Sequence, residues 1–185
     1  LMVWTEQGIG DLAMFAGFFD DLADLAPRVM LETIGRFRGL MQRSFPWAEI
    51  YQRDQLPADY VQQFDVRAQV PIGDLPLLLE ADFDRLPARR GYLIPDAAQT
   101  WRLRERYQQR FPGRLLVGIS WRSGNKNSAT TRSAELDLWR DVLAQPGLGF
   151  VSLQYGEVGA EVGGINTRLG VDILHDPEID PLRDL

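Results

Sequence analysis

The sequence of 185 residues contains no cysteine, one histidine and one lysine. Without cysteine, disulfides, thiolate catalysis and zinc or iron–sulfur centres built on cysteine are excluded. His175 is the one imidazole that a serine triad could use as its base, and Lys126 is the one amine that could form a Schiff base. The sequence also lacks any run of about 18 apolar residues. We therefore expect no transmembrane segment.

Basic residues are outnumbered, with 20 Lys and Arg against 26 Asp and Glu and a net charge of -6. This balance argues against nucleic acid or an anionic membrane as the partner. No basic stretch precedes an apolar run and a cleavage site, so we see no secretion signal and take the cytoplasm as the default location. Because the chain begins at Leu1 in a strand-like run and stops in an acidic connection at 176–185, we expect a fragment of a longer protein.

Hydrophobic residues make up 45% of the chain, and strand-like and helix-like segments alternate along it. Strands or extended segments are predicted at 1–4, 29–34, 65–70, 115–121, 149–154 and 171–174, and helices at 37–42, 59–64, 75–80, 96–110, 134–144, 157–165 and from Asp11 toward Pro27. This alternation is typical of parallel βαβ units. The class is therefore α/β, with Rossmann-like parallel sheets and with 115–121 as a buried central strand. Pro112-Gly113 divides the chain into two blocks, 1–112 and 113–185.

The first candidate functional segment follows the first predicted strand. It comprises Glu6, Gln7, Gly8, Gly10 and Asp11. In open parallel sheets, ligands bind at the carboxyl ends of strands, where such loops lie. The segment has no Gly-Lys-Ser/Thr and lacks the third glycine of a dinucleotide fingerprint. The carboxylate of Asp11 is a candidate general base for an acceptor hydroxyl. The structural alternative is that Asp11 is only the N-cap of the helix.

The second segment, 121–133, follows the strongest predicted strand and gathers cationic and hydroxyl side chains. Arg122, Lys126 and Arg132 with Ser123 and Ser133 suit a phosphate or diphosphate, which needs fixed cations and N–H donors. The alternative is a solvated polar loop in which Ser133 caps the following helix. If the two blocks are lobes of a cleft, we expect this segment to face the one that carries Asp11.

Three other features favour plain structural interpretations. Asp82-Phe83-Asp84 has the D-x-D form of a metal site, but such a pair arises easily by chance in an acidic chain. His175 has the character of an ordinary loop residue. The arginines of segment 96–110, at positions 102, 104, 106 and 110, indicate a solvated helix face.

Seven short stretches, in order, resemble the glycosyltransferase-like region that follows tetratricopeptide repeats in many bacterial proteins, which is similar to heptosyltransferases and more remotely to O-GlcNAc transferase. They are V-W-T-E-Q-G-I-G-D at 3–11, R-S-F-P at 43–46, F-D-V-R-A-Q-V-P-I-G-D-L at 64–75, G-Y-L-I-P-D at 91–96, V-G-I-S-W-R-S-G at 117–124, R-S at 132–133 and F-V-S-L-Q-Y-G at 150–156. They extend over almost the whole chain, and together they are specific.

The resemblance implies a GT-B-like glycosyltransferase, with an acceptor-side domain at 1–112 and the first part of a donor-side domain at 113–185. It implies a nucleotide sugar as donor, with no metal and no other cofactor. In the family pattern the Asp of the Gly-Asp pair is the general base, which is Asp11 here. The segment after the second domain's first strand contacts donor phosphate and sugar, which implicates Ser123, Lys126, Arg132 and Ser133.

Two departures from the family pattern temper this expectation. First, Thr131-Arg132-Ser133 stands at the position where heptosyltransferases have a motif similar to Arg-Asp-Asp-Lys. Second, these 185 residues do not contain the Asp-rich strand that comes later in the family, nor the glycine-rich start of the helix that follows it. We therefore expect little activity from the fragment alone. The rival hypothesis is a non-catalytic module that binds a glycan or a protein beside a repeat array. A dinucleotide-dependent oxidoreductase is a third reading, but the chain lacks its fingerprint.

Overall fold

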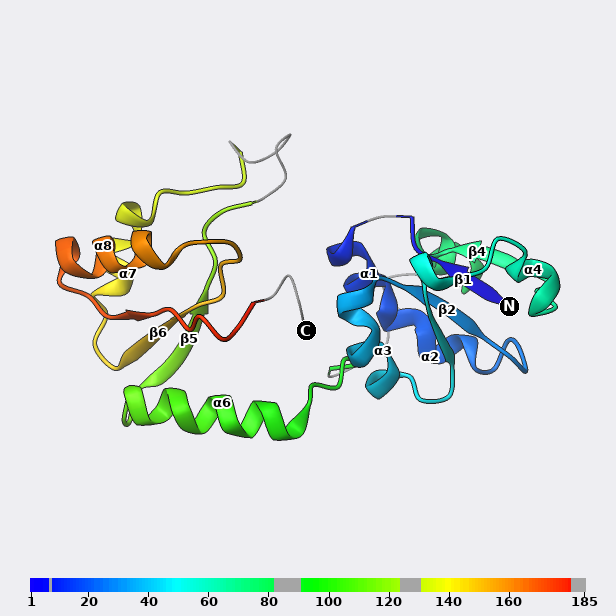
Figure 1. Cartoon of the computed structure of the whole chain (residues 1–185), viewed down its shortest axis with the longest axis horizontal. Coiled ribbons are helices and arrows are strands. Elements are labelled where there is room, and N and C mark those ends of the chain that lie inside the picture. The colour runs from blue at the N-terminus through cyan, green and yellow to red at the C-terminus, as the bar shows by residue number, and fades with distance from the viewer. Residues whose placement is uncertain (7, 82–90, 124–130, 181–185) are drawn as a thin grey trace. The chain divides into compact units, whose positions relative to one another are not determined.

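The computed structural model describes residues 1–6, 8–81, 91–123 and 131–180. It divides into two compact units, the first from Leu1 to Asp96 and the second beginning at Ala97 (Figure 1). Two predictions lie outside the described residues: the D-x-D metal site at Asp82–Asp84 and the donor-site role of Lys126. The sequence placed the boundary at 112, whereas the structure groups the helix that precedes this point with the second unit.

The first unit contains a parallel four-stranded sheet with the order β3-β2-β1-β4. Its strands are β1 (Met2–Trp4), β2 (Met30–Thr33), β3 (Glu49–Gln52) and β4 (Gln69–Pro71). In register, Met2 lies beside Met30 in β2 and Gln69 in β4. Neighbouring residues of β1 point to opposite faces, and both Met2 and Val3 are buried, so this strand is covered on both sides. The predicted α/β class with parallel strands is thus confirmed.

Short helices connect these strands, and several supply the core of the first unit. They are α1 (Ile9–Phe15), η1 (Ala16–Phe18), α2 (Phe19–Leu22), η2 (Gly35–Phe37), α3 (Arg38–Ser44), η3 (Arg53–Gln55), α4 (Tyr60–Gln63), η4 (Ile72–Asp74) and α5 (Leu75–Leu78), where η marks a 3₁₀ helix. Leu12, Phe19 and Met41 pack with Val3 and Leu31 of the sheet in one apolar cluster. The sequence did not predict β3, because its residues E-I-Y-Q contain no apolar run; Ile50 is its one buried residue and the others are partly exposed.

The second unit contains a parallel three-stranded sheet with the order β5-β6-β7. Its elements are α6 (Ala97–Arg110), β5 (Leu115–Ile119), η5 (Leu136–Trp139), α7 (Arg140–Leu143), β6 (Leu148–Ser152), α8 (Gly159–Leu169) and β7 (Ile173–Leu174). The predicted central position of β5 is wrong. Among the described strands β5 lies at an edge, with Leu115 68% exposed, whereas Phe150 and Val151 of β6 are buried. An apolar run indicates a strand but does not specify its neighbours.

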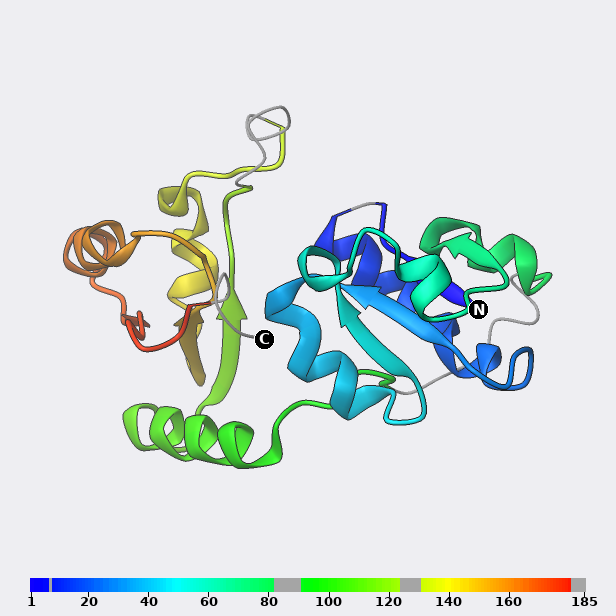
Figure 2. The ribbon, with the colours of Figure 1, turned by 45° about the vertical axis from the view of Figure 1, so that its right-hand side comes forward.

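Helices α7 and α8 lie on the same side of β5 and β6 (Figures 1 and 2). Leu143 of α7 and Val162 and Ile165 of α8 pack with Phe150 of β6 in the second apolar cluster. This layer of helices on a parallel sheet is the usual way to bury its apolar side chains. Among the described helices, none combines the length and the apolar composition that crossing a bilayer requires.

Helix α6 is attached to the second unit by packing and by ion pairs. Phe111, 1% exposed, lies so close to Gly149 of β6 that an added Cβ there would come within 2.6 Å of the ring. Arg106 pairs with Asp176 and, at 2.7 Å, with Glu178. Arg110 likewise pairs with Asp172 at 2.8 Å. The predicted solvated face is confirmed for Arg102, Arg104 and Arg110, which are exposed, whereas Arg106 is only partly exposed. The ion pairs of Arg106 and Arg110 explain why the helix groups with this unit.

Candidate functional site

In the first unit, Glu6 lies where the strand order reverses. It directly follows Thr5 at the carboxyl end of β1, and its Oε1 accepts the backbone N–H of Gly73, which follows β4, at 3.2 Å. The strands β2 and β3 lie on one side of β1, and β4 lies on the other. In open α/β sheets this reversal point is the usual place for a ligand. The exposed carboxylate of Glu6 is thus held at the point where the strand order reverses.

Asp11 lies two residues inside α1, and its predicted N-cap position is wrong. The helix begins at Ile9 with Gly8 as the N-cap, in an extended conformation, and Gly10 is helical rather than part of a turn. Asp11 Oδ2 accepts the backbone N–H of Gly8 at 3.1 Å, which is the return bond of a capping box. Gln7 lies outside the described residues. The Asp11 carboxylate is therefore partly engaged with the backbone and only partly buried.

A buried polar network beneath Glu6 was not found from the sequence. Glu32 of β2 is 9% exposed and Thr5 is 3% exposed. Glu32 Oε1 accepts three hydrogen bonds. Two come from Thr5, from its backbone N–H at 3.0 Å and from its hydroxyl at 2.7 Å, and the third comes from the Nε–H of Arg53 at 2.8 Å. These bonds fix the residue from which the Glu6 loop starts. The available signal was an acidic residue inside an otherwise apolar strand, since a buried carboxylate needs a partner.

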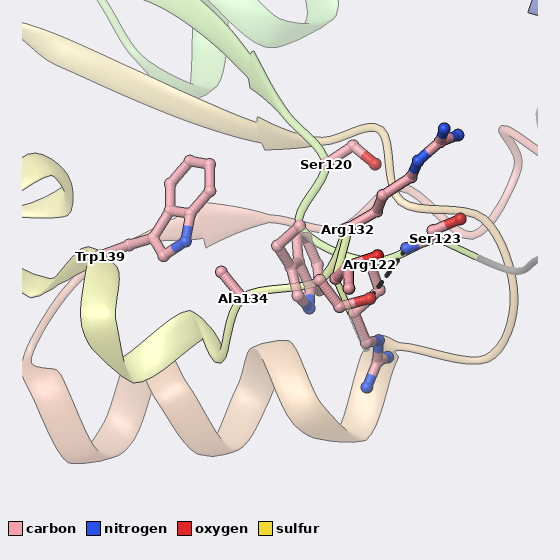
Figure 3. A pocket seen from close by; sticks show the side chains of 9 residues that line it. Ser120, Arg122, Ser123, Arg132, Ala134 and Trp139 are labelled. Atoms are coloured by element: carbon pink, nitrogen blue, oxygen red, sulfur yellow. Dashed lines mark hydrogen bonds between the residues drawn. The ribbon is translucent and has the colours of Figure 1, made fainter. Parts of the chain in front are cut away.

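The second unit has a cavity of about 540 Å³ at the carboxyl end of β5 (Figure 3). It is lined by Ser120, Trp121, Arg122, Ser123, Thr131, Arg132, Ser133, Ala134 and Trp139. Three of the predicted donor-site residues, Ser123, Arg132 and Ser133, are thus brought together at one place. Its volume lies within the range of small-molecule sites, and the pocket is broad and open to solvent.

The loop after β5 is held by Gln154, a second residue that the sequence did not reveal as functional. Gln154 is 5% exposed. Its Oε1 accepts the hydroxyl of Ser120 at 3.1 Å and the backbone N–H groups of Trp121 at 3.0 Å and Arg122 at 2.8 Å. Its Nε2 donates to the carbonyl of Arg122 at 3.1 Å. One amide side chain from beyond β6 therefore fixes the backbone of one cavity wall. The only local signal was a polar residue at the end of the otherwise apolar run predicted as a strand at 149–154.

Ser133 closes the loop rather than capping a helix. Its Oγ accepts the backbone N–H of Ser123 at 3.1 Å, drawn as a dashed line in Figure 3. The following helix, η5, begins only at Leu136 with Glu135 before it, so the predicted helix cap at Ser133 is wrong. The Ser123–Ser133 bond instead joins the two described ends of the polar segment. A helix N-terminus at Ser133 therefore plays no part in the electrostatics of this cavity.

The two arginines of the cavity differ in their electrostatic state. Arg122 pairs with Glu161 of α8 at 2.6 Å, and Trp121 Nε1 donates to the same carboxylate at 3.1 Å. Arg132 is exposed and makes no ion pair with any residue that the structure describes. The uncompensated positive charge of the described cavity wall therefore comes from Arg132, which suits an anionic ligand.

Comparison with known proteins gives one clear relative. The chain is 32% identical to protein FlbA of Caulobacter vibrioides over 198 aligned positions, which include the whole of this chain. The chain spans 33% of the length of FlbA. No family model matches the chain, and no solved structure matches it.

Proposed function

We propose that this chain is part of a metal-independent glycosyltransferase of GT-B type that moves a sugar from a nucleotide sugar to an acceptor hydroxyl in the cytoplasm. In this proposal the first unit is the acceptor side and the second unit is the donor side. The observation that carries it is the cavity beside β5, where Arg132, which has no ion-pair partner among the described residues, lies with the hydroxyls of Ser123 and Ser133. Fixed cations with hydroxyl and N–H donors are what a diphosphate requires when no metal is used.

In this proposal the reaction is a single displacement at the anomeric carbon. The acceptor oxygen attacks the anomeric carbon of the sugar and forms the new C–O bond, while the bond from that carbon to the diphosphate oxygen breaks. The carboxylate of Asp11 takes the proton of the acceptor hydroxyl as general base. The nucleoside diphosphate leaves with both electrons of the broken bond, and Arg132 stabilises the negative charge that develops on it.

One observation favours a second candidate function, a non-catalytic module that recognises a glycan or a protein. The Asp11 carboxylate accepts the N–H of Gly8 at 3.1 Å, which is a sufficient structural reason for its presence. A module of this kind has no reason to prefer nucleoside diphosphates. Ligand binding therefore separates the two functions.

The test is calorimetric titration of the chain with UDP, GDP and ADP, using Arg132→Ala and a matched variant. Arg102→Ala removes the same charge from an exposed position of α6 outside the cavity. We expect micromolar to millimolar binding by the unmodified chain and by Arg102→Ala, and at least about tenfold weaker binding by Arg132→Ala, because a charge-assisted bond contributes about 1.5–3 kcal/mol. Absence of nucleotide binding by the chain and by the full-length protein would reject the transferase proposal.

A further inference from the structure

The cavity beside β5 has two ends of different chemistry. Figure 3 shows Arg122, Ser123 and Arg132 on one side and Trp139 on the other, with Ala134 between them. The first end offers cations and hydroxyls, and the second offers an aromatic ring beside a methyl group. A cavity of about 540 Å³ is larger than a single phosphate needs. The arrangement therefore fits a ligand with an anionic part and a flat apolar part.

Trp139 packs against the apolar cluster of the second unit and also lines the cavity. It is the last residue of η5, is partly buried, and packs against the apolar cluster that contains Leu136. Its indole N–H has no hydrogen-bond acceptor in the part of the chain that the structure describes. Trp121 differs, since it is 3% exposed and donates its N–H to Glu161. Of the two indoles at the cavity, Trp139 is the one with a free polar tip and an accessible ring.

The residues around Trp139 distinguish between a base and a sugar as its partner. The described lining residues include no carboxylate and no side-chain amide, the groups that read several sugar hydroxyls at once. A nucleobase needs only a π-face, and stacking on an aromatic ring requires no hydrogen-bonding groups.

We propose that Trp139 is the stacking surface for the nucleobase of the nucleotide donor, with the diphosphate at Arg132. This inference rests on the proposed function and adds the residue that recognises the nucleoside. Because stacking discriminates weakly among bases, the described part of the site selects for a nucleoside diphosphate more than for one particular base. UDP, GDP and ADP are therefore expected to bind within about tenfold of one another.

The test compares three probes on the same chain: UDP, inorganic pyrophosphate and glucose 1-phosphate. Trp139→Ala is expected to weaken UDP binding by about five- to a hundredfold and to leave pyrophosphate binding within about twofold. Arg132→Ala is expected to weaken both. Trp139→Phe keeps an aromatic face and should retain most of the UDP affinity. Trp101→Ala, an exposed tryptophan on α6 outside the cavity, is the matched control.

The outcomes separate this inference from the proposed function. If the unmodified chain binds neither UDP nor pyrophosphate, both fail. If Arg132→Ala weakens UDP binding but Trp139→Ala does not, the donor site stands and the stacking role is overturned. If both Trp139 variants bind UDP and pyrophosphate more weakly by the same factor, the stacking role is also overturned, since that pattern indicates a collapsed cavity. Weaker glucose 1-phosphate binding with unchanged UDP binding would assign the ring to the sugar instead.

Discussion

The side-chain oxygen of Gln154 accepts the backbone N–H of Arg122 at 2.8 Å, although the two residues are 32 positions apart. Replacing Gln154 by Ala leaves the buried N–H of Trp121 and that of Arg122 without this acceptor. Each unpaired buried group costs about 1–3 kcal/mol, so we expect a loss of at least about 2 kcal/mol in the free energy of unfolding of the second unit. Nucleotide affinity should fall as well, because the cavity wall is no longer fixed.

Urea unfolding and calorimetry on the same samples check this expectation. Gln145→Ala is the control, since the exposed side chain of Gln145 has, among the described residues, a single hydrogen bond, to the carbonyl of Asp141. A Gln154→Ala variant as stable as the Gln145 variant would show that the loop has other supports.

Asp11→Asn tests the general base. Asparagine keeps a side-chain oxygen that can accept the N–H of Gly8, so the free energy of unfolding should change by less than about 1 kcal/mol. It cannot take a proton from an acceptor hydroxyl, so kcat should fall by at least about a hundredfold. The measurement is release of nucleoside diphosphate by the full-length protein, with Asp24→Asn at an exposed position as control. Unchanged turnover would leave Asp11 with its capping bond as its only role.

Glu32 offers a stability test in the first unit. Glu32→Ala removes the shared acceptor of Thr5 and Arg53, and we expect a loss of about 3 kcal/mol, because two of the three donors belong to the buried Thr5. Glu32→Gln retains an acceptor oxygen and loses only the charge, so its cost should be about 1 kcal/mol. Chemical denaturation that resolves the first unit measures both. Equal stability of the two variants would contradict a structural role for this network.

Tyr107 gives a pH-dependent prediction for the second unit. Burial, followed by its hydrogen bond to Asp176, raises the pKa of Tyr107 to about 12. In the unfolded chain the phenol titrates near its ordinary pKa of about 10. The folded state therefore keeps the phenol protonated to higher pH than the unfolded chain does. The contribution of Tyr107 to the free energy of unfolding is complete below pH about 10 and is lost as the pH rises toward 12.

Thermal melts at increasing alkaline pH test this sign. The stability advantage of the unmodified chain over Tyr107→Phe should shrink across this interval, whereas Tyr60→Phe, in the first unit, should not reproduce the effect. An advantage that grows with pH would show that the phenolate is the form that the fold prefers.

Local patterns predicted the elements better than their neighbours. The helical period over 96–110 corresponds to α6 at Ala97–Arg110, and the apolar run at 149–154 corresponds to β6 at Leu148–Ser152. The strand β3 was missed because its partly exposed residues have no apolar run. The edge position of β5 depends on pairing with residues more than 30 positions away, which no local pattern contains.

The same limit applies to the two candidate segments. Sequence composition led to the cavity residues Arg132 and Ser133, since cations and hydroxyls gather after a strand. Their proposed roles remain predictions. Gln154 could not be found in this way, because it acts through hydrogen bonds to a loop more than 30 positions earlier in the chain. Trp139 could not be found either, because no local pattern separates a tryptophan that lines a cavity from one that only packs against a core. The helix start was misplaced because Gly8, which has no capping side chain, takes the N-cap position while Asp11 bonds back to it from within the first turn.

The edge position of β5 also bears on the handling of the purified chain. Leu115 of β5 is 68% exposed and Leu153, beside Gly118, is 50% exposed. Within the described residues, β5 has one neighbour, β6, and its other edge presents main-chain donors and acceptors. Such an edge is a template for intermolecular strand addition. Concentrated samples should therefore self-associate through this edge, and a lysine in place of Leu115 should keep them monodisperse.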